Sequence, residues 1–163
     1  MSAEALENLR KEVEQAAEGL VFISESDSRV VFVAAPEARV EEVMPAAVVK
    51  WLSAQHDGRT DVLFQDEPLP RLAARAVEVK EADTFLHNRE QILEPDEPES
   101  VEAARKWSLI REALEQNLQE LRVIRFGEPH PRYDTVEGQV SIFVVGRTQD
   151  GALAGILTCA VET

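Results

Sequence analysis

The last part of the chain constrains the fold most strongly, because it reads as two β-strands joined by a tight turn. Side chains over residues 140–148, VSIFVVGRT, alternate between two faces, which is the period of a strand. Gln149-Asp150-Gly151 follows as a strong hairpin-turn signal, and residues 153–161 are expected to pair back. The sequence therefore predicts an antiparallel sheet at the carboxyl-terminal end.

Helical spacing and shorter β patterns fill the rest of the chain. Apolar residues three or four apart predict a helix over about residues 3–17, with Ser2 as its cap and Gly19 just past its end. Further elements are expected at 29–34 (strand), 45–52 (helix starting at Pro45), 75–79 (short strand), 82–87 (short helix), 100–119 (helix capped by Ser100) and 122–126 (strand). Helices covering a mainly antiparallel sheet make an α+β sandwich, and residues 1–163 are expected to form one domain.

Composition supports one globular domain and excludes one class of partner. The chain has 163 residues, of which 44% are apolar and 29% charged, as in globular proteins. Its net charge is −14, from 31 acidic and 17 basic residues, and no basic patch is visible. Because nucleic acid is a polyanion, direct binding to it is not expected. An acidic surface suits a basic protein partner, and it equally suits simple solubility.

The sequence also bears on cellular location. Cys159 is the only cysteine, so no disulfide can form within the chain. No run of residues is long and apolar enough for a transmembrane helix. The first residues lack the basic and apolar regions of a signal peptide. We therefore expect a cytoplasmic protein that does not contact membranes.

Few residues carry a signal for catalysis. The three histidines, His56, His87 and His130, are scattered and none lies in a metal-ligand spacing. There is no P-loop or dinucleotide fingerprint, and Cys159 in its strand is expected to be a buried, inert thiol. We therefore expect no cofactor, no metal site of the protein's own and no enzymatic activity, although a Ser–His–Asp assembly made by the fold stays open.

Two regions together carry a resemblance to a known family. Residues 18–26, EGLVFISES, place a serine-flanked glutamate directly after an apolar run, between a helix and a strand. The second region comprises Val123-x-Arg125-x-Gly127-Glu128, Val144-Val145-Gly146-x-Thr148, Leu153-Ala154-Gly155-Ile156 and the final Val161-Glu162-Thr163. With these motifs the chain resembles the nuclease A inhibitor family, strongly over 5–34 and 100–163.

The resemblance implies a fold and a function. The fold would be an α-β-α sandwich. The function would be inhibition of a basic, Mg²⁺-dependent, non-specific DNA/RNA nuclease of the ββα-metal type, whose active site the inhibitor plugs. It implies a monomer when free and a 1:1 complex with the nuclease.

The resemblance also assigns partner-binding residues. Glu25 matches the glutamate that meets basic residues of the nuclease, with Ser24 and Ser26 beside it. Thr163 matches the terminal threonine that approaches the catalytic metal of the nuclease through water, and Glu162 precedes it. In the loop ahead of the long helix, Gln91 matches a family glutamine. The family tryptophan there has no counterpart, and the nearest positions are Leu93 and Pro95.

Elementary chemistry makes these assignments reasonable. A nuclease site attracts phosphate, and a carboxylate such as that of Glu25 can replace a phosphate oxygen as the acceptor of a charge-assisted hydrogen bond. Residues 20–23 buried in the core would hold that carboxylate rigidly and reduce the ordering cost of binding. Thr163 combines a hydroxyl and the α-carboxylate, which are the hard oxygens that suit Mg²⁺ and its waters.

The missing tryptophan motivates an alternative function. Buried aromatic residues are frequent hot spots of binding, so its loss weakens the expectation for the usual target. The alternative is an acidic protein-binding module that kept the fold, lost nuclease inhibition and binds another partner. The sequence leaves open the cognate nuclease, the affinity, and the roles of residues 59–72 and 128–138, which are longer than in typical family members.

Overall fold

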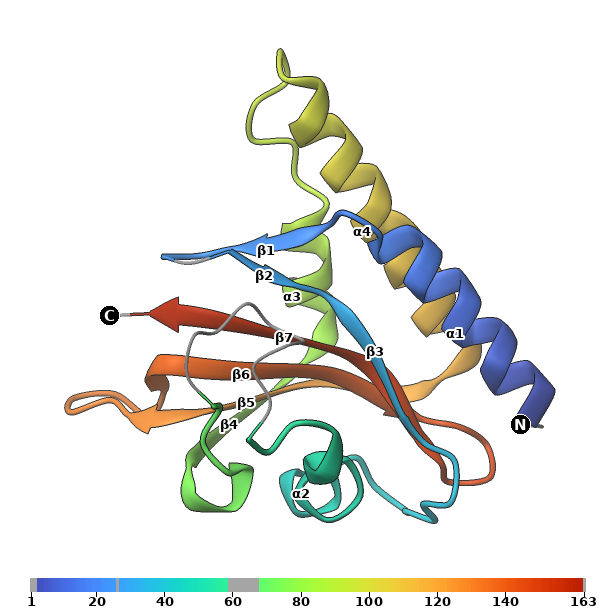
Figure 1. Cartoon of the computed structure of the whole chain (residues 1–163), viewed down its shortest axis with the longest axis vertical. Coiled ribbons are helices and arrows are strands. Elements are labelled where there is room, and N and C mark those ends of the chain that lie inside the picture. The colour runs from blue at the N-terminus through green and yellow to red at the C-terminus, as the bar shows by residue number, and fades with distance from the viewer. Residues whose placement is uncertain (1–2, 26, 59–67, 163) are drawn as a thin grey trace.

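The protein is an α+β sandwich in which one antiparallel sheet lies between two layers of helix. The computed structural model describes residues 3–25, 27–58 and 68–162. Five strands form the main sheet in the order β3-β7-β6-β5-β4, and β1 and β2 form a separate two-stranded ribbon. Helices α1, α3 and α4 lie on one side of the sheet and α2 on the other (Figure 1). The elements are α1 Ala3–Ala17, β1 Val21–Ile23, β2 Asp27–Arg29, β3 Val31–Ala35, α2 Pro45–Leu52, β4 Ala76–Glu81, α3 Ala82–Arg89, α4 Pro98–Asn117, β5 Gln119–Pro129, β6 Val136–Arg147 and β7 Leu153–Glu162, with short 3₁₀ turns at Ser53–Gln55 and Leu72–Ala74.

The sheet has a hydrophobic core on each face, which is why its central strand β6 is apolar on both sides. Toward α1 and α4 it presents Val140, Ile142 and Val144, and these pack with Leu9, Val13, Ile110 and Leu114. Toward α2 it presents Phe143 and Val145, which pack with Val48 and Leu52. The predicted alternation of β6 and its pairing with β7 are therefore confirmed.

Most of the expected elements are present, with three corrections. Ser100 does not cap α4: the helix begins at Pro98, and the Ser100 hydroxyl instead accepts a hydrogen bond from the Glu94 amide at 3.2 Å. Strand β5 takes in residues 119–121, which the helical pattern had extended into. The β1–β2 ribbon was not expected at all. The predicted cap Ser2 and most of the 59–72 segment lie outside the described residues.

The β1–β2 ribbon gives the apolar run 20–23 its structural role. Leu20 and Phe22 are buried, and Phe22 stacks on Phe85 of α3 with ring centroids 5.8 Å apart. Gly19 turns the chain out of α1 with φ +74°, a left-handed conformation that glycine adopts without strain. Together these features anchor the base of the ribbon, while its tip extends to the same end of the sheet as the end of β7 (Figure 1).

Candidate functional site

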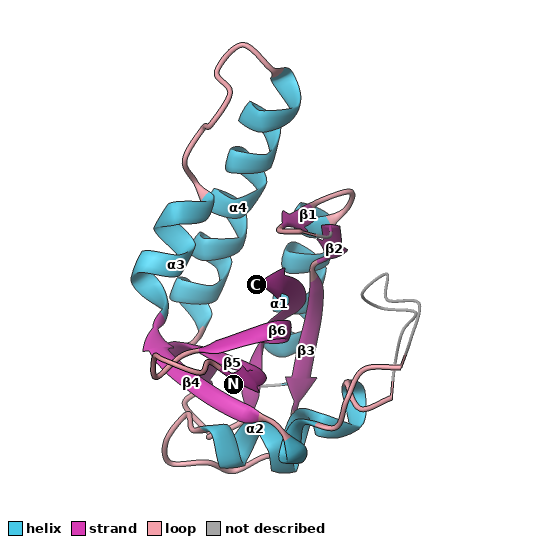
Figure 2. Ribbon diagram, turned by 90° about the vertical axis from the view of Figure 1, so that its left-hand side faces the viewer, coloured by secondary structure: helices cyan, strands magenta, loops and turns pink. Residues whose placement is uncertain are grey.

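The tip of the β1–β2 ribbon is bonded to the end of β7. The Glu25 amide donates to the Val161 carbonyl at 3.4 Å, and the Val161 amide donates to the Ser24 hydroxyl at 3.1 Å. Residues from opposite ends of the chain are thus held side by side. We call this end of the sheet the hairpin end, comprising residues 24–25, 161–162 and 136–139 (Figure 2).

Ser24 therefore fixes the loop by a bond to strand β7, which is distant in the sequence. The Glu25 backbone is tied to β7, while the residue itself is exposed. Next to it, Ile23 is 74% exposed on β1. A rigid backbone that presents an exposed acid and an exposed aliphatic side chain is suited to contact another macromolecule, because little order remains to be imposed on binding.

Strand β6 lies along the other edge of β7 at the hairpin end. Gly138 is paired with Glu162, and Gln139 with Val161. The last described residue of β7 therefore lies between the β1–β2 ribbon and the beginning of β6.

The Glu162 carboxylate is engaged within the protein. Both of its oxygens accept from the Arg125 guanidinium of β5. The same guanidinium reaches the buried Glu78 of β4 at 3.3 Å, and Glu78 also accepts from the Val136 amide at 3.3 Å. This network ties β7 to β5 and β4. A role of Glu162 in contacting a partner stays a prediction.

A small cleft of about 260 Å³ adjoins this network; it is lined among others by Phe22, Phe85, Arg89, Arg125 and Glu162. The Arg89 guanidinium lies 5.0 Å from the Phe22 ring centroid and 4.9 Å from that of Phe85. Burial lowers the pKa of Arg89, and the nearby Glu162 carboxylate opposes that shift. Neither Arg89 nor Arg125 was predicted to be a site residue. For Arg125 a signal existed, because it shares a strand face with the buried Val123.

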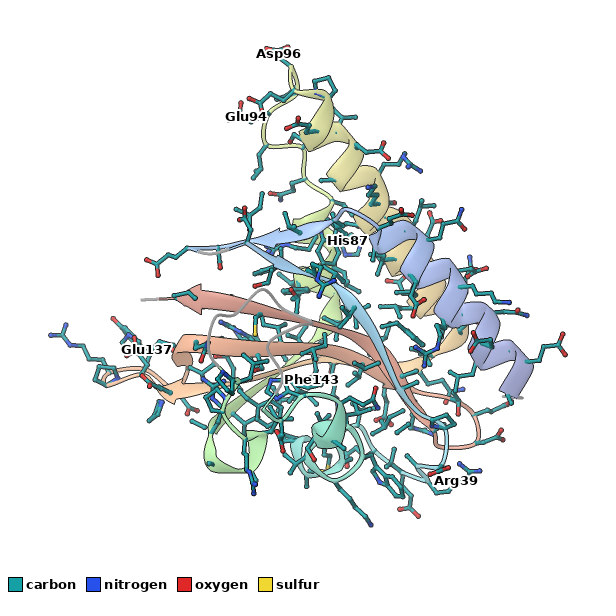
Figure 3. All side chains as sticks on the ribbon, viewed as in Figure 1. Arg39, His87, Glu94, Asp96, Glu137 and Phe143 are labelled. Carbon is teal, nitrogen blue, oxygen red and sulfur yellow. The ribbon has the colours of Figure 1, made fainter. Side chains whose placement is uncertain are left out.

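The loop between α3 and α4 lies apart from the hairpin end. Gln91 and Leu93 are both exposed, Leu93 by 77%. Glu94 and Asp96 of the same loop stand at the apex of the molecule (Figure 3). The base of the loop is fastened by an ion pair of 2.9 Å between Glu90 and Arg111. The structure thus brings Ser24, Glu25 and Glu162 to one end, with Gln91 and Leu93 on a separate projection. Ser26 and Thr163 lie outside the described residues.

A Ser–His–Asp arrangement does occur, but in the core. His56 Nε2 lies 2.7 Å from Ser141 Oγ, and His56 Nδ1 lies 3.4 Å from Asp57 Oδ1. His56 is 1% exposed and Ser141 is fully buried, so neither side chain offers a substrate any surface. Cys159 is buried as expected, and burial raises its pKa to about 11. We interpret the Ser141–His56–Asp57 arrangement as a hydrogen-bonded element of the core beneath α2.

His56 makes the stability of the fold depend on pH. Burial lowers the pKa of His56 below its ordinary value of 6.5, against the opposing effect of Asp57. As the pH falls, the unfolded chain therefore takes up a proton at His56 before the folded protein does. The contribution of His56 to the free energy of unfolding is complete above pH 6.5 and is lost as the pH drops from there toward the pKa of the folded state. Urea unfolding at pH 7.5 and pH 5.5 is expected to show this loss.

A matched pair of variants isolates the contribution of His56. His56→Gln should flatten the decline in unfolding free energy between pH 7.5 and pH 5.5, whatever its effect at pH 7.5. His87→Gln changes an exposed histidine and should keep the slope of the parent protein. An unchanged slope in His56→Gln would show that His56 is not the titrating group.

Within residues 3–25, 27–58 and 68–162, no three His, Cys, Asp or Glu side chains form a group that could hold a metal ion. Among the helices of those residues, none combines the length and apolar character needed to cross a membrane.

The fold and the hairpin end define a class: an α-β-α sandwich that holds the loop carrying Glu25 beside the end of β7, an inner strand of its five-stranded sheet. A family model described as nuclease A inhibitor-like protein matches residues 7–163, nearly the whole chain. The chain therefore belongs to the nuclease A inhibitor-like family. A comparison with curated proteins found no match.

Proposed function

We propose that this protein inhibits a basic, Mg²⁺-dependent, non-specific nuclease of the ββα-metal type by inserting its hairpin end into the active site. The observation that carries the proposal is the bonding of Ser24 and Glu25 to Val161. It supports a single composite surface built from the acidic loop and the end of the chain. Membership of the nuclease A inhibitor-like family supports the class of partner.

In the proposed complex, the Glu25 carboxylate accepts hydrogen bonds from the arginine or lysine side chains that would otherwise hold a phosphate. Such bonds are strong only if the acceptor is already in place, and the Glu25 backbone is fixed by its bond to Val161. Thr163 follows Glu162 directly, so its side-chain hydroxyl is proposed to reach the water on the nuclease metal. The Arg125–Glu162 ion pair would set the direction in which this last residue leaves the sheet.

A titration tests the proposal. The protein is added to several ββα-metal nucleases, including nuclease A, at fixed Mg²⁺, and cleavage of plasmid DNA is measured. Cleavage by at least one enzyme should fall to zero near a 1:1 molar ratio, and light scattering should show one molecule of each protein in the complex. Full cleavage at tenfold excess with every enzyme would refute the proposal.

Calorimetry of the same pair with and without EDTA separates the two proposed contacts. Removal of the metal should weaken binding, because only the contact near Thr163 involves metal-bound water, while the contacts of Glu25 should persist. Equal affinity with and without the metal would argue against the role of Thr163.

Leu93 favours a second candidate function. It is one of the two positions nearest to the family tryptophan, with Pro95, and is 77% exposed on a loop remote from Glu25. The second candidate is a protein-binding module of the same fold whose basic partner is not a nuclease. Affinity capture from the host cytoplasm, the compartment we propose for the protein, would support this alternative if it recovers the same non-nuclease partner from parent protein but not from a Glu25→Gln variant.

A further inference from the structure

The hairpin joining β5 to β6 continues past the end of β7. Strand β7 ends at Glu162, opposite Gly138 of β6. Strand β6 begins two residues earlier at Val136, which pairs with Pro129 of β5, and residues 130–135 close the loop. Figure 1 shows this loop projecting at the hairpin end, and Figure 3 marks Glu137 at its base. A partner that covers Glu25 and the end of the chain would therefore lie next to this loop.

The loop is ordered by one histidine. The His130 amide donates to the Thr135 carbonyl at 3.0 Å, which closes the loop at its base. His130 Nδ1 accepts from the amides of Arg132 and Tyr133, at 3.0 and 3.2 Å. Prolines at 129 and 131 restrict the backbone on both sides of the histidine. A loop held in this way loses little conformational freedom on binding.

This ordered loop presents an exposed aromatic residue. Tyr133 is 68% exposed, and its ring contacts only one other ring, that of His130, among the ring contacts of the described residues, at a centroid distance of 4.9 Å. It is the single tyrosine of the chain. Tyrosine is enriched at binding hot spots because it buries a large apolar area with few rotatable bonds and still offers a hydroxyl.

We infer that Tyr133, held by the His130-centred loop, is an aromatic anchor that packs against the nuclease on the opposite side of β7 from the Glu25 contact. The inference rests on the proposed function and adds a third contact to it. It places the aromatic contribution to binding on the β5–β6 hairpin at the hairpin end. The α3–α4 loop, which lies apart from that end, offers Leu93 and no aromatic residue. It also gives a role to the segment 128–138, which is longer than its counterpart in typical family members.

The test measures binding to the nuclease that the parent protein inhibits best. Tyr133→Ala should raise the dissociation constant about tenfold or more, chiefly through faster dissociation. Tyr133→Phe keeps the ring and should retain most of the affinity. Leu109→Ala removes a 41%-exposed apolar side chain from the outer face of α4 and should bind like the parent protein.

Variants of His130 test the positioning role. His130→Ala should weaken binding less than Tyr133→Ala does, and should speed amide hydrogen exchange at residues 132 and 133 in the free protein. His130→Asn keeps a side-chain acceptor and should partly restore both properties. When the parent protein binds the nuclease, hydrogen exchange at the amides of residues 132 and 133 should become slower than in the free protein.

The outcomes separate this inference from the proposed function. If the parent protein binds the nuclease and Tyr133→Ala binds equally well, the anchor is refuted, and a loss of binding in Glu25→Gln would leave the proposed function standing. If the parent protein inhibits no ββα-metal nuclease, the proposed function is refuted and the inference falls with it.

Discussion

Glu25→Gln is expected to raise the inhibition constant at least about thirtyfold, corresponding to about 2 kcal/mol of binding free energy. The substitution keeps the shape and the backbone bond to Val161, so the loop should stay in place. What is lost is the charge proposed to pair with the cations of the nuclease, and those cations would then be buried in the complex without a counter-charge. The inhibition constant is measured from initial rates of DNA cleavage, with far-UV circular dichroism to confirm the fold.

Glu112→Gln is the matched control for net charge. Glu112 is exposed on α4, on the helical layer, and its substitution removes one negative charge as Glu25→Gln does. If overall charge governed binding, both variants would lose affinity equally, and a local role of Glu25 would be excluded.

A double variant that combines Glu25→Gln with deletion of Thr163 tests whether these two residues act as one unit. If they do, its loss of affinity should be smaller than the sum of the losses in the two single variants.

Gly155→Ala should destabilise the fold by about 3 kcal/mol or more. Gly155 lies in β7 between Val33 of β3 and Val145 of β6. A Cβ at this position would overlap the Val144 carbonyl oxygen. Because the clash is with the backbone of the neighbouring strand, no rotamer change can relieve it, and β6 and β7 would have to separate. The midpoint of urea unfolding, followed by circular dichroism, measures the loss.

Gly58→Ala provides the comparison for Gly155→Ala. Gly58 has φ +76°, but a Cβ there meets no atom within 4 Å. This variant should therefore be destabilised only by the strain of alanine in a left-handed backbone conformation, by about 1 kcal/mol. Similar losses in both variants would mean that the close approach of β6 and β7 is not what requires glycine at 155.

Local patterns were sufficient to predict most of the elements. The spacing of Leu6, Leu9 and Val13 marks α1 because one helix face is buried, and the alternation in β6 with the turn at 149–151 marks the β6–β7 hairpin. The turn forms as expected, with Gly151 at φ +90°. The β1–β2 ribbon was missed because its tip is fixed by Val161, more than 130 residues further along the chain.

The candidate site was predictable only where its residues form a local motif. Ser24 and Glu25 form a recognisable local motif, so the sequence could mark them. The ion pair of Arg125 with Glu162, and the contact of His56 with Ser141 across 85 positions, arise only when strands are aligned in the sheet. Such contacts have no local sequence signature. The assignment of Gln91 as a partner-binding residue stays a prediction, and the loop that carries it lies on a separate projection.

The position of the two chain ends has a practical consequence for how the protein is produced. Helix α1 begins at the end of the molecule opposite the place where β7 finishes (Figure 1). A purification tag or fluorescent fusion joined ahead of α1 would leave the acidic loop open to solvent. The same addition joined on the carboxyl-terminal side of β7 would follow a strand end that is bonded to the β1–β2 ribbon and paired with β6, so it would crowd the proposed partner surface.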